Sequence, residues 1–81
     1  MEQPAATYPV HGPSLRKRRM ALGLTVQEAA DKAGISRSYL QRLETGIRER
    51  MGPKRYTRLR TALNATNDQI SPPPEIPTEE R

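Results

Sequence analysis

Four polar residues, Arg37, Ser38, Gln41 and Arg42, have types and spacing that suit recognition chemistry. An arginine guanidinium can donate two parallel hydrogen bonds to O6 and N7 of guanine, and a glutamine amide can pair with N6 and N7 of adenine. Residues spaced this way along a helix share one face, so the four side chains can act on one partner. Most polar helix faces are merely solvated, so the elements that hold these residues decide between the two interpretations.

Two short apolar-periodic segments joined at Gly34 would position these side chains. The first opens with a capping box, in which the Thr25 hydroxyl accepts from the amide of Glu28 and the Glu28 carboxylate accepts from the amide of Thr25. Ser36 can cap the second segment, and Gly34 permits the sharp turn between them. Two helices at a tight turn, with a polar outer face on the second, indicate a helix-turn-helix, which presents its second helix to the DNA major groove.

The rest of the chain predicts more helix and no strand. Ser14 can cap a first helix, Pro53 suits the first position of a fourth, and a short fifth could start near Thr66 and close the core with Ile70. We therefore expect an all-α fold with four to five helices over residues 14–70. The flanking stretches, 1–13 and 71–81, are rich in proline and are expected to be disordered tails, the second of them acidic.

Charge is unevenly distributed along the chain. The net charge is +5, but residues 14–70 hold 13 of the 14 Lys and Arg and only five acidic residues, a net +8. The stretch from Ser71 onward is net −2. An excess of positive charge in the folded part favours a polyanionic partner.

Several functional classes find no support in the sequence. The chain has no Cys, and its only His, His11, lies in a proline-containing stretch and is expected to be solvated. We find no glycine-rich phosphate loop and no metal-ligand spacing, so we expect no enzyme activity, no metal and no cofactor. No apolar run approaches the roughly 20 residues of a membrane span, and the start lacks a signal-peptide pattern. We therefore expect no membrane association and a cytoplasmic, nucleoid-associated protein.

The segments from Leu15 to Ile70 resemble the phage repressor and Cro type of helix-turn-helix, often called the XRE family. The resemblance rests on LRKRRMALGLT, EAADKAGIS, YLQRLETG and YTRLRTAL, with small or aliphatic residues and a turn glycine at the family's spacing. It implies a compact, repressor-like fold. The family commonly has a phosphate-binding Gln at the first position of its second helix, where this chain has Val26.

Two sets of site residues follow from the pattern and the resemblance together. We expect Arg37, Ser38, Gln41 and Arg42 to contact bases. We expect phosphate contacts from seven residues on helix ends and in the arginine-rich loop: Thr25, Gln27, Tyr39, Arg48, Arg50, Lys54 and Arg55. Arg19 and Glu44 each lie within an apolar stripe, and because buried charges need partners, we predict a structural ion pair between them.

The expected function is sequence-specific binding of double-stranded DNA by a transcriptional regulator, with repression as the expected outcome. The resemblance implies a homodimer on DNA, for which the fourth helix and the region of Ile70 would supply the surface. Two alternatives stay open. The same domain could serve as an antitoxin or a phage lysogeny or excision factor, with the tails contacting a protein partner. It could also be a protein–protein interaction module that binds a transcription component.

Overall fold

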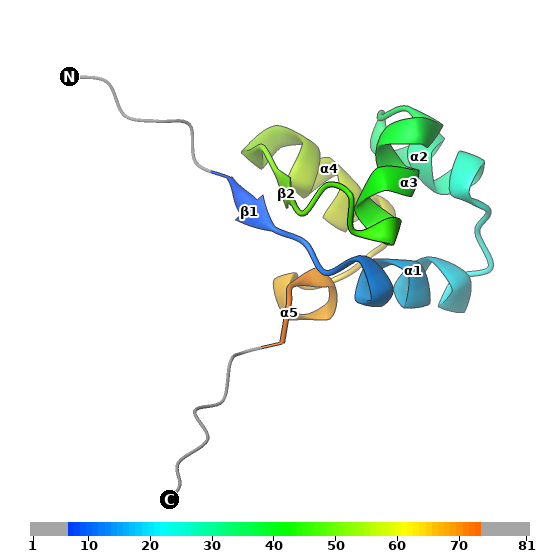
Figure 1. The fold of residues 1–81 in the computed structure, drawn as a ribbon. Helices are drawn as coiled ribbons and strands as arrows, with labels where there is room; N and C mark the ends of the chain where they lie inside the picture. Colours follow the sequence, from blue (N-terminus) through cyan, green and yellow to red (C-terminus); the bar gives the residue numbers. More distant parts are fainter. Residues whose placement is uncertain (1–6, 74–81) are drawn as a thin grey trace, which may run out of the picture.

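The computed structural model describes residues 7–73 and places five helices around one core (Figure 1). The helices are α1 (Gly12–Ala21), α2 (Val26–Ala33), α3 (Arg37–Thr45), α4 (Pro53–Ala62) and α5 (Asn67–Ile70). In Figure 1, α1 runs along the base of the domain beside α5, with α2, α3 and α4 above it. The all-α prediction is confirmed, and no helix in the described range is long and apolar enough to cross a membrane.

The two central helices start and stop where local signals predict. The Thr25 hydroxyl accepts from the Glu28 amide at 3.0 Å, and the Glu28 carboxylate accepts from the Thr25 amide at 2.9 Å. Gly34 ends α2 with a φ of +69°, a conformation that favours glycine. The Ser36 hydroxyl then caps α3 by accepting from the Tyr39 amide at 3.1 Å. The caps and the turn therefore fix the helix-turn-helix geometry locally.

The core is built from small residues on α2 and large aliphatic residues on its neighbours. Ala29, Ala30 and Ala33 are buried, and α2 packs against both α3 and α4. Fully buried leucines fill the remaining space, and Ile70 of α5 closes the core as predicted. Ile70 has no exposed surface, so its side chain belongs to the core of the domain.

The structure differs from the sequence prediction at the N-terminal side. Residues 7–13, expected to be part of a tail, carry a short strand, β1 (Tyr8–Pro9), which pairs antiparallel with β2 (Arg50–Met51). Val10 is buried, and its amide donates to the carbonyl of Glu49 at 2.8 Å. The folded part thus begins before Ser14. The other segments assigned to tails, residues 1–6 and 74–81, lie outside the described residues.

Helix α1 also begins earlier than predicted, because its first turn is fixed by distant contacts. A Cβ atom on Gly12 would lie 2.5 Å from the carbonyl oxygen of Glu44, so only glycine allows this approach to the end of α3. The Ser14 hydroxyl bonds to Nδ1 of His11 at 2.7 Å instead of capping a helix. His11 is half-buried, which corrects the expectation that it is solvated.

Candidate nucleic-acid interface

The outer face of α3 brings the four expected base-contacting residues together. Arg37, Ser38, Gln41 and Arg42 are all exposed, whereas Leu40 and Leu43 on the opposite face are buried in the core. Within residues 7–73, none of these four side chains forms an intramolecular hydrogen bond. Their donors and acceptors therefore remain available to an external partner, as base recognition requires.

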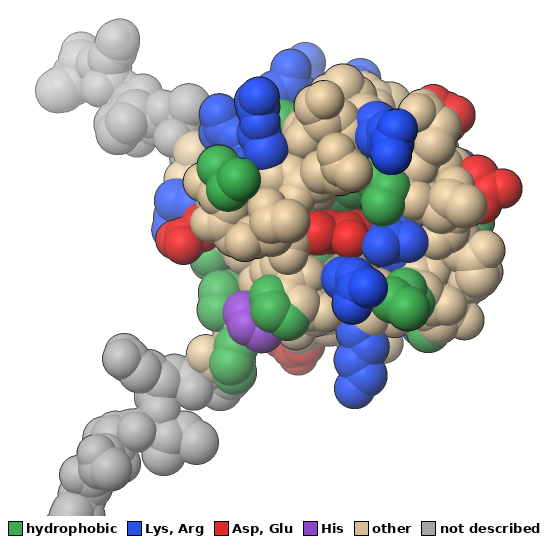
Figure 2. Space-filling view, turned by 45° about the vertical axis from the view of Figure 1, so that its right-hand side comes forward, with side chains coloured by type: hydrophobic (Ala, Val, Ile, Leu, Met, Phe, Trp, Pro, Cys, Tyr) green, Lys and Arg blue, Asp and Glu red, His purple; other side chains and the backbone are tan. Residues whose placement is uncertain are grey.

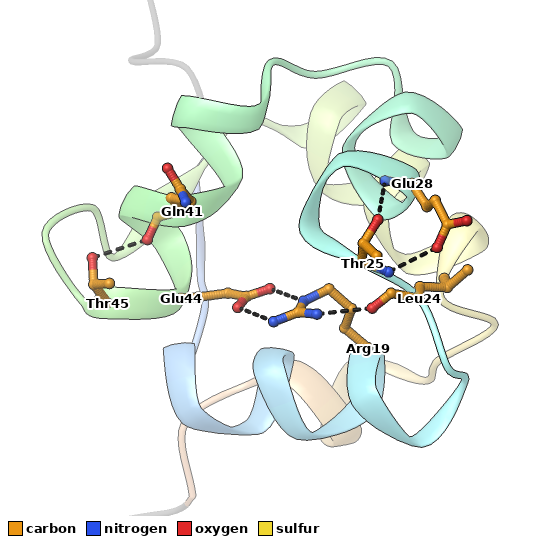
Figure 3. Close-up of polar contacts among 7 residues, drawn as sticks. All are labelled: Arg19, Leu24, Thr25, Glu28, Gln41, Glu44 and Thr45. Atoms are coloured by element: carbon orange, nitrogen blue, oxygen red, sulfur yellow. Dashed lines mark hydrogen bonds and ion pairs between the residues drawn. The ribbon is translucent and has the colours of Figure 1, made fainter.

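A shallow groove of about 430 Å³ runs along this face, lined by Ser38, Gln41, Arg42, Thr45 and Ile47. The Thr45 hydroxyl donates to the main-chain carbonyl of Gln41 at 2.9 Å (Figure 3). Ile47 is 77% exposed. The sequence interpretation missed Thr45 and Ile47, although an isolated isoleucine in the polar stretch 46–50 was a readable signal.

The predicted ion pair between Arg19 and Glu44 is present and anchors α3 to α1. Arg19 donates through Nε to Oε2 at 2.7 Å and through Nη2 to Oε1 at 2.9 Å (Figure 3). Its Nη1 donates to the carbonyl of Leu24 at 2.8 Å. The two side chains are only 10% and 6% exposed. Hydrogen bonding to the Glu44 carboxylate raises the pKa of Arg19 even though burial lowers it, so the guanidinium stays charged.

Tyr39 lies beneath two guanidinium groups from separate segments. The Cζ atoms of Arg48 and Arg55 are 5.3 and 5.2 Å from the centroid of its ring. The ring itself is half-buried and packs against the core. Among the described residues, no carboxylate forms an ion pair with either guanidinium. Two like charges held over one ring favour an anion close by, and the Tyr39 ring supports them by cation–π contact.

The remaining expected phosphate contacts differ in how free their side chains are. Gln27 donates to Asp31 at 2.9 Å, and Arg50 donates from Nε to the Thr7 hydroxyl at 2.7 Å. Lys54 is exposed and forms no hydrogen bond to the described residues. Thr25 uses its hydroxyl oxygen as a cap acceptor, which leaves the hydroxyl hydrogen to donate. Arg48, Lys54 and Arg55 are therefore the most available cations.

One departure from the family pattern and one contact that supports the fold can be located in the structure. Val26 packs half-buried against the core, and because a valine side chain has no hydrogen-bonding group, it cannot supply the polar phosphate contact that the family's Gln makes. Arg18 donates to the carbonyls of Leu63 and Asn64, both at 2.9 Å, and so ties α1 to the end of α4. Asn64 there has a φ of +49°, in the left-handed region that asparagine tolerates.

Positive charge alone does not mark the interface. In the view of Figure 2, Lys and Arg side chains stand at several separate places around the domain instead of forming one patch. Arg18 and Arg19 belong to the fold itself through their intramolecular bonds. The α3 face combines four polar side chains that form no hydrogen bond to the described residues with exposed cations on the neighbouring segments.

The comparisons with known proteins agree with this geometry. Residues 12–71 match the family described as "Helix-turn-helix domain". The restriction-modification controller protein C.AhdI from Aeromonas hydrophila has 33% sequence identity and a TM-score of 0.66, over 72% of this chain and 86% of that chain. The clp gene regulator ClgR from C. glutamicum has 32% identity and a TM-score of 0.63, over 70% of this chain and 73% of that chain.

A third solved structure shares the fold at lower identity. SinR, a master regulator for biofilm formation solved in complex with DNA, has 22% identity and a TM-score of 0.67, over 72% of this chain and 95% of that chain. No curated protein matches the chain in sequence. The family match covers most of the chain and confirms the resemblance found in the sequence. The chain belongs to the helix-turn-helix family, and it is a DNA-binding transcription regulator.

Proposed function

We propose that α3 enters the major groove and reads base edges through Arg37, Ser38, Gln41 and Arg42. The observation that carries this proposal is that all four side chains are exposed and unbonded on one side of a helix whose other side is fixed in the core. The Arg19–Glu44 pair holds that helix to α1. A rigid helix with free donors and acceptors suits direct readout, because little order must be gained on binding.

Phosphate contacts would hold the domain in register on the duplex. Arg48, Lys54 and Arg55 supply the charge, and the Thr25 hydroxyl can donate to a further phosphate oxygen. Gln27 and Arg50 already donate hydrogen bonds within the protein, and Tyr39 supports the guanidinium groups of Arg48 and Arg55, so these three residues would contribute less to phosphate binding. Three exposed cations on one domain would provide only a modest electrostatic attraction to the DNA backbone.

A single domain with so few contacts would bind weakly, so we further propose a two-fold dimer on a palindromic operator. Occupation of such a site near a promoter would repress transcription. The protein would then act in the cytoplasm, associated with the nucleoid.

Titration of a mixed-sequence duplex at several salt concentrations tests the electrostatic part. Three phosphate-bound cations predict a slope of log K against log salt of about −3 per domain. Binding that is absent even at low salt would contradict the proposal. Selection of bound sequences from a random duplex pool then yields the operator, and a palindromic result would support the dimer.

Two substitutions separate the proposed roles. Arg42→Ala should relax base preference at one position of the selected operator and cost about 5- to 150-fold in affinity for it. Lys54→Ala should weaken all sequences alike and reduce the salt slope by about 1. If both variants weaken every sequence equally, Arg42 is a phosphate contact and its assignment is wrong.

A further inference from the structure

Ile47 is the most exposed large apolar side chain among the described residues, at 77%, compared with 54% for Met20. It comes directly after Gly46, which ends α3 with a φ of +86°. The next amide, that of Arg48, donates to the carbonyl of Arg42 at 3.0 Å and so ties the segment back to α3. Ile47 is therefore held on an ordered turn and not on a free loop.

The position of Ile47 connects the two parts of the interface. It lines one groove with Ser38, Gln41 and Arg42. A neighbouring groove is lined by Ile47 with Arg42, Arg48, Glu49 and Arg50. The first groove contains the proposed base-reading face, and the second has three arginines and one glutamate, so its net charge is positive. A partner that fits both grooves must offer an apolar group and an anion close together.

We propose that Ile47 determines specificity by packing against the 5-methyl group of a thymine in the major groove. This inference rests on the proposed function, in which α3 reads that groove. The thymine methyl is the apolar group that base pairs present there, and it lies near the phosphate backbone that the neighbouring arginines would contact. An apolar protein pocket fits less well, because covering Ile47 would also bury the guanidinium groups beside it.

The magnitude follows from the area removed from water. Burial of one methyl group against an aliphatic side chain corresponds to about 3- to 5-fold in affinity. The effect should be confined to one thymine in each half-site, since Ile47 is a single side chain. The contribution of the other thymine methyl groups to the affinity should not depend on Ile47.

The test uses the full chain and the duplex selected from a random pool, with each thymine replaced in turn by deoxyuridine. Deoxyuridine keeps every hydrogen-bonding group of thymine and lacks only the methyl. Wild-type protein should lose about 3- to 5-fold at one position, and Ile47→Ala should bind thymine and deoxyuridine equally there. Met20→Ala is the matched control, because Met20 is also exposed but lies on α1, and its deoxyuridine profile should equal that of the wild type.

Three results would overturn the inference. Ile47→Ala could keep the full sensitivity to deoxyuridine, or the wild type could bind the selected duplex without any such sensitivity. Sedimentation could show that Ile47→Ala changes the oligomeric state, which would place the side chain between protein copies. Each leaves DNA binding by α3 intact, whereas failure of the wild type to bind any duplex overturns the proposed function as well.

Discussion

Replacement of Arg19 by methionine should destabilise the domain severely. The substitution removes two hydrogen bonds to Glu44, at 2.7 and 2.9 Å, and one to the carbonyl of Leu24. It leaves a carboxylate that is only 6% exposed without its counter-ion. Breaking a buried pair in this way costs about 3–5 kcal/mol. A chain of 81 residues has a total stability of roughly 4–12 kcal/mol, so the substitution would remove from about a quarter of that stability to all of it.

The compensating double variant separates the pair from simple loss of packing. Arg19→Met combined with Glu44→Leu removes both charges and keeps comparable volume. Its free energy of unfolding should lie within about 1–2 kcal/mol of the wild type, because no uncompensated charge remains. Arg19→Lys should fall between the wild type and Arg19→Met, since lysine keeps the charge but loses the two-pronged geometry.

Urea unfolding followed by far-ultraviolet circular dichroism measures these four proteins and the single variant Glu44→Leu, which completes the double-mutant cycle and gives the coupling between the two side chains. The reasoning requires that the double variant be more stable than Arg19→Met. If Arg19→Met costs less than about 1 kcal/mol, or if the double variant is no better, the pair does not hold α3 in place.

Substitutions at three further positions test other contacts. Gly12→Ala should cost about 1–3 kcal/mol in urea unfolding, because its Cβ would lie 2.5 Å from the carbonyl oxygen of Glu44; an unchanged midpoint would contradict this close approach. Thr25→Ala should cost about 1 kcal/mol by loss of the capping box, and Thr25→Ser should restore most of it. Tyr39→Leu should weaken DNA binding by about 2- to 5-fold through loss of support for both guanidinium groups, whereas Tyr39→Phe should not; a comparable loss with phenylalanine would show that the hydroxyl itself contacts a phosphate.

The sequence was most informative where a residue and its partner lie within one helical turn. Thr25 and Glu28 cap each other across three positions, Ser36 caps the amide three residues on, and Gly34 fulfils its turn role through its own backbone. Such signals can be read without the rest of the chain. The pairing of Arg19 with Glu44 is a longer-range case, and it was predictable because each charge interrupts an otherwise apolar stripe.

The sequence did not predict elements that depend on contacts between distant segments. Strand β1 exists because Tyr8 and Pro9 pair with Met51 and Arg50, and two residues are too few for an alternating pattern to show. The sequence analysis assigned Gly12 to a tail. A glycine is needed there because the backbone of Glu44 in α3 approaches it closely, and this contact cannot be read from the sequence. Both features require knowledge of which segments meet.

The candidate site also has parts that the sequence predicts and parts that it does not. The polar face of α3 could be predicted from helical spacing alone, and the structure places its four residues together. The contact of Tyr39 with two arginines and the bond from Arg50 to Thr7 could not, because their partners come from other segments.

The hydrogen bond from the amide of His11 to the carbonyl of Ile70, at 2.8 Å, brings the start of α1 next to the end of α5. Because the first and last helices meet there, a short linker from the end of α5 to the strand that precedes α1 could close the chain, so circular permutation is open to this fold. The exposed turn at Gly23, where an added Cβ would meet no atom within 4 Å, is a natural place for new ends. A permuted chain should still present the outer face of α3, because that face is positioned by the packing of the helices and not by the order in which the chain connects them.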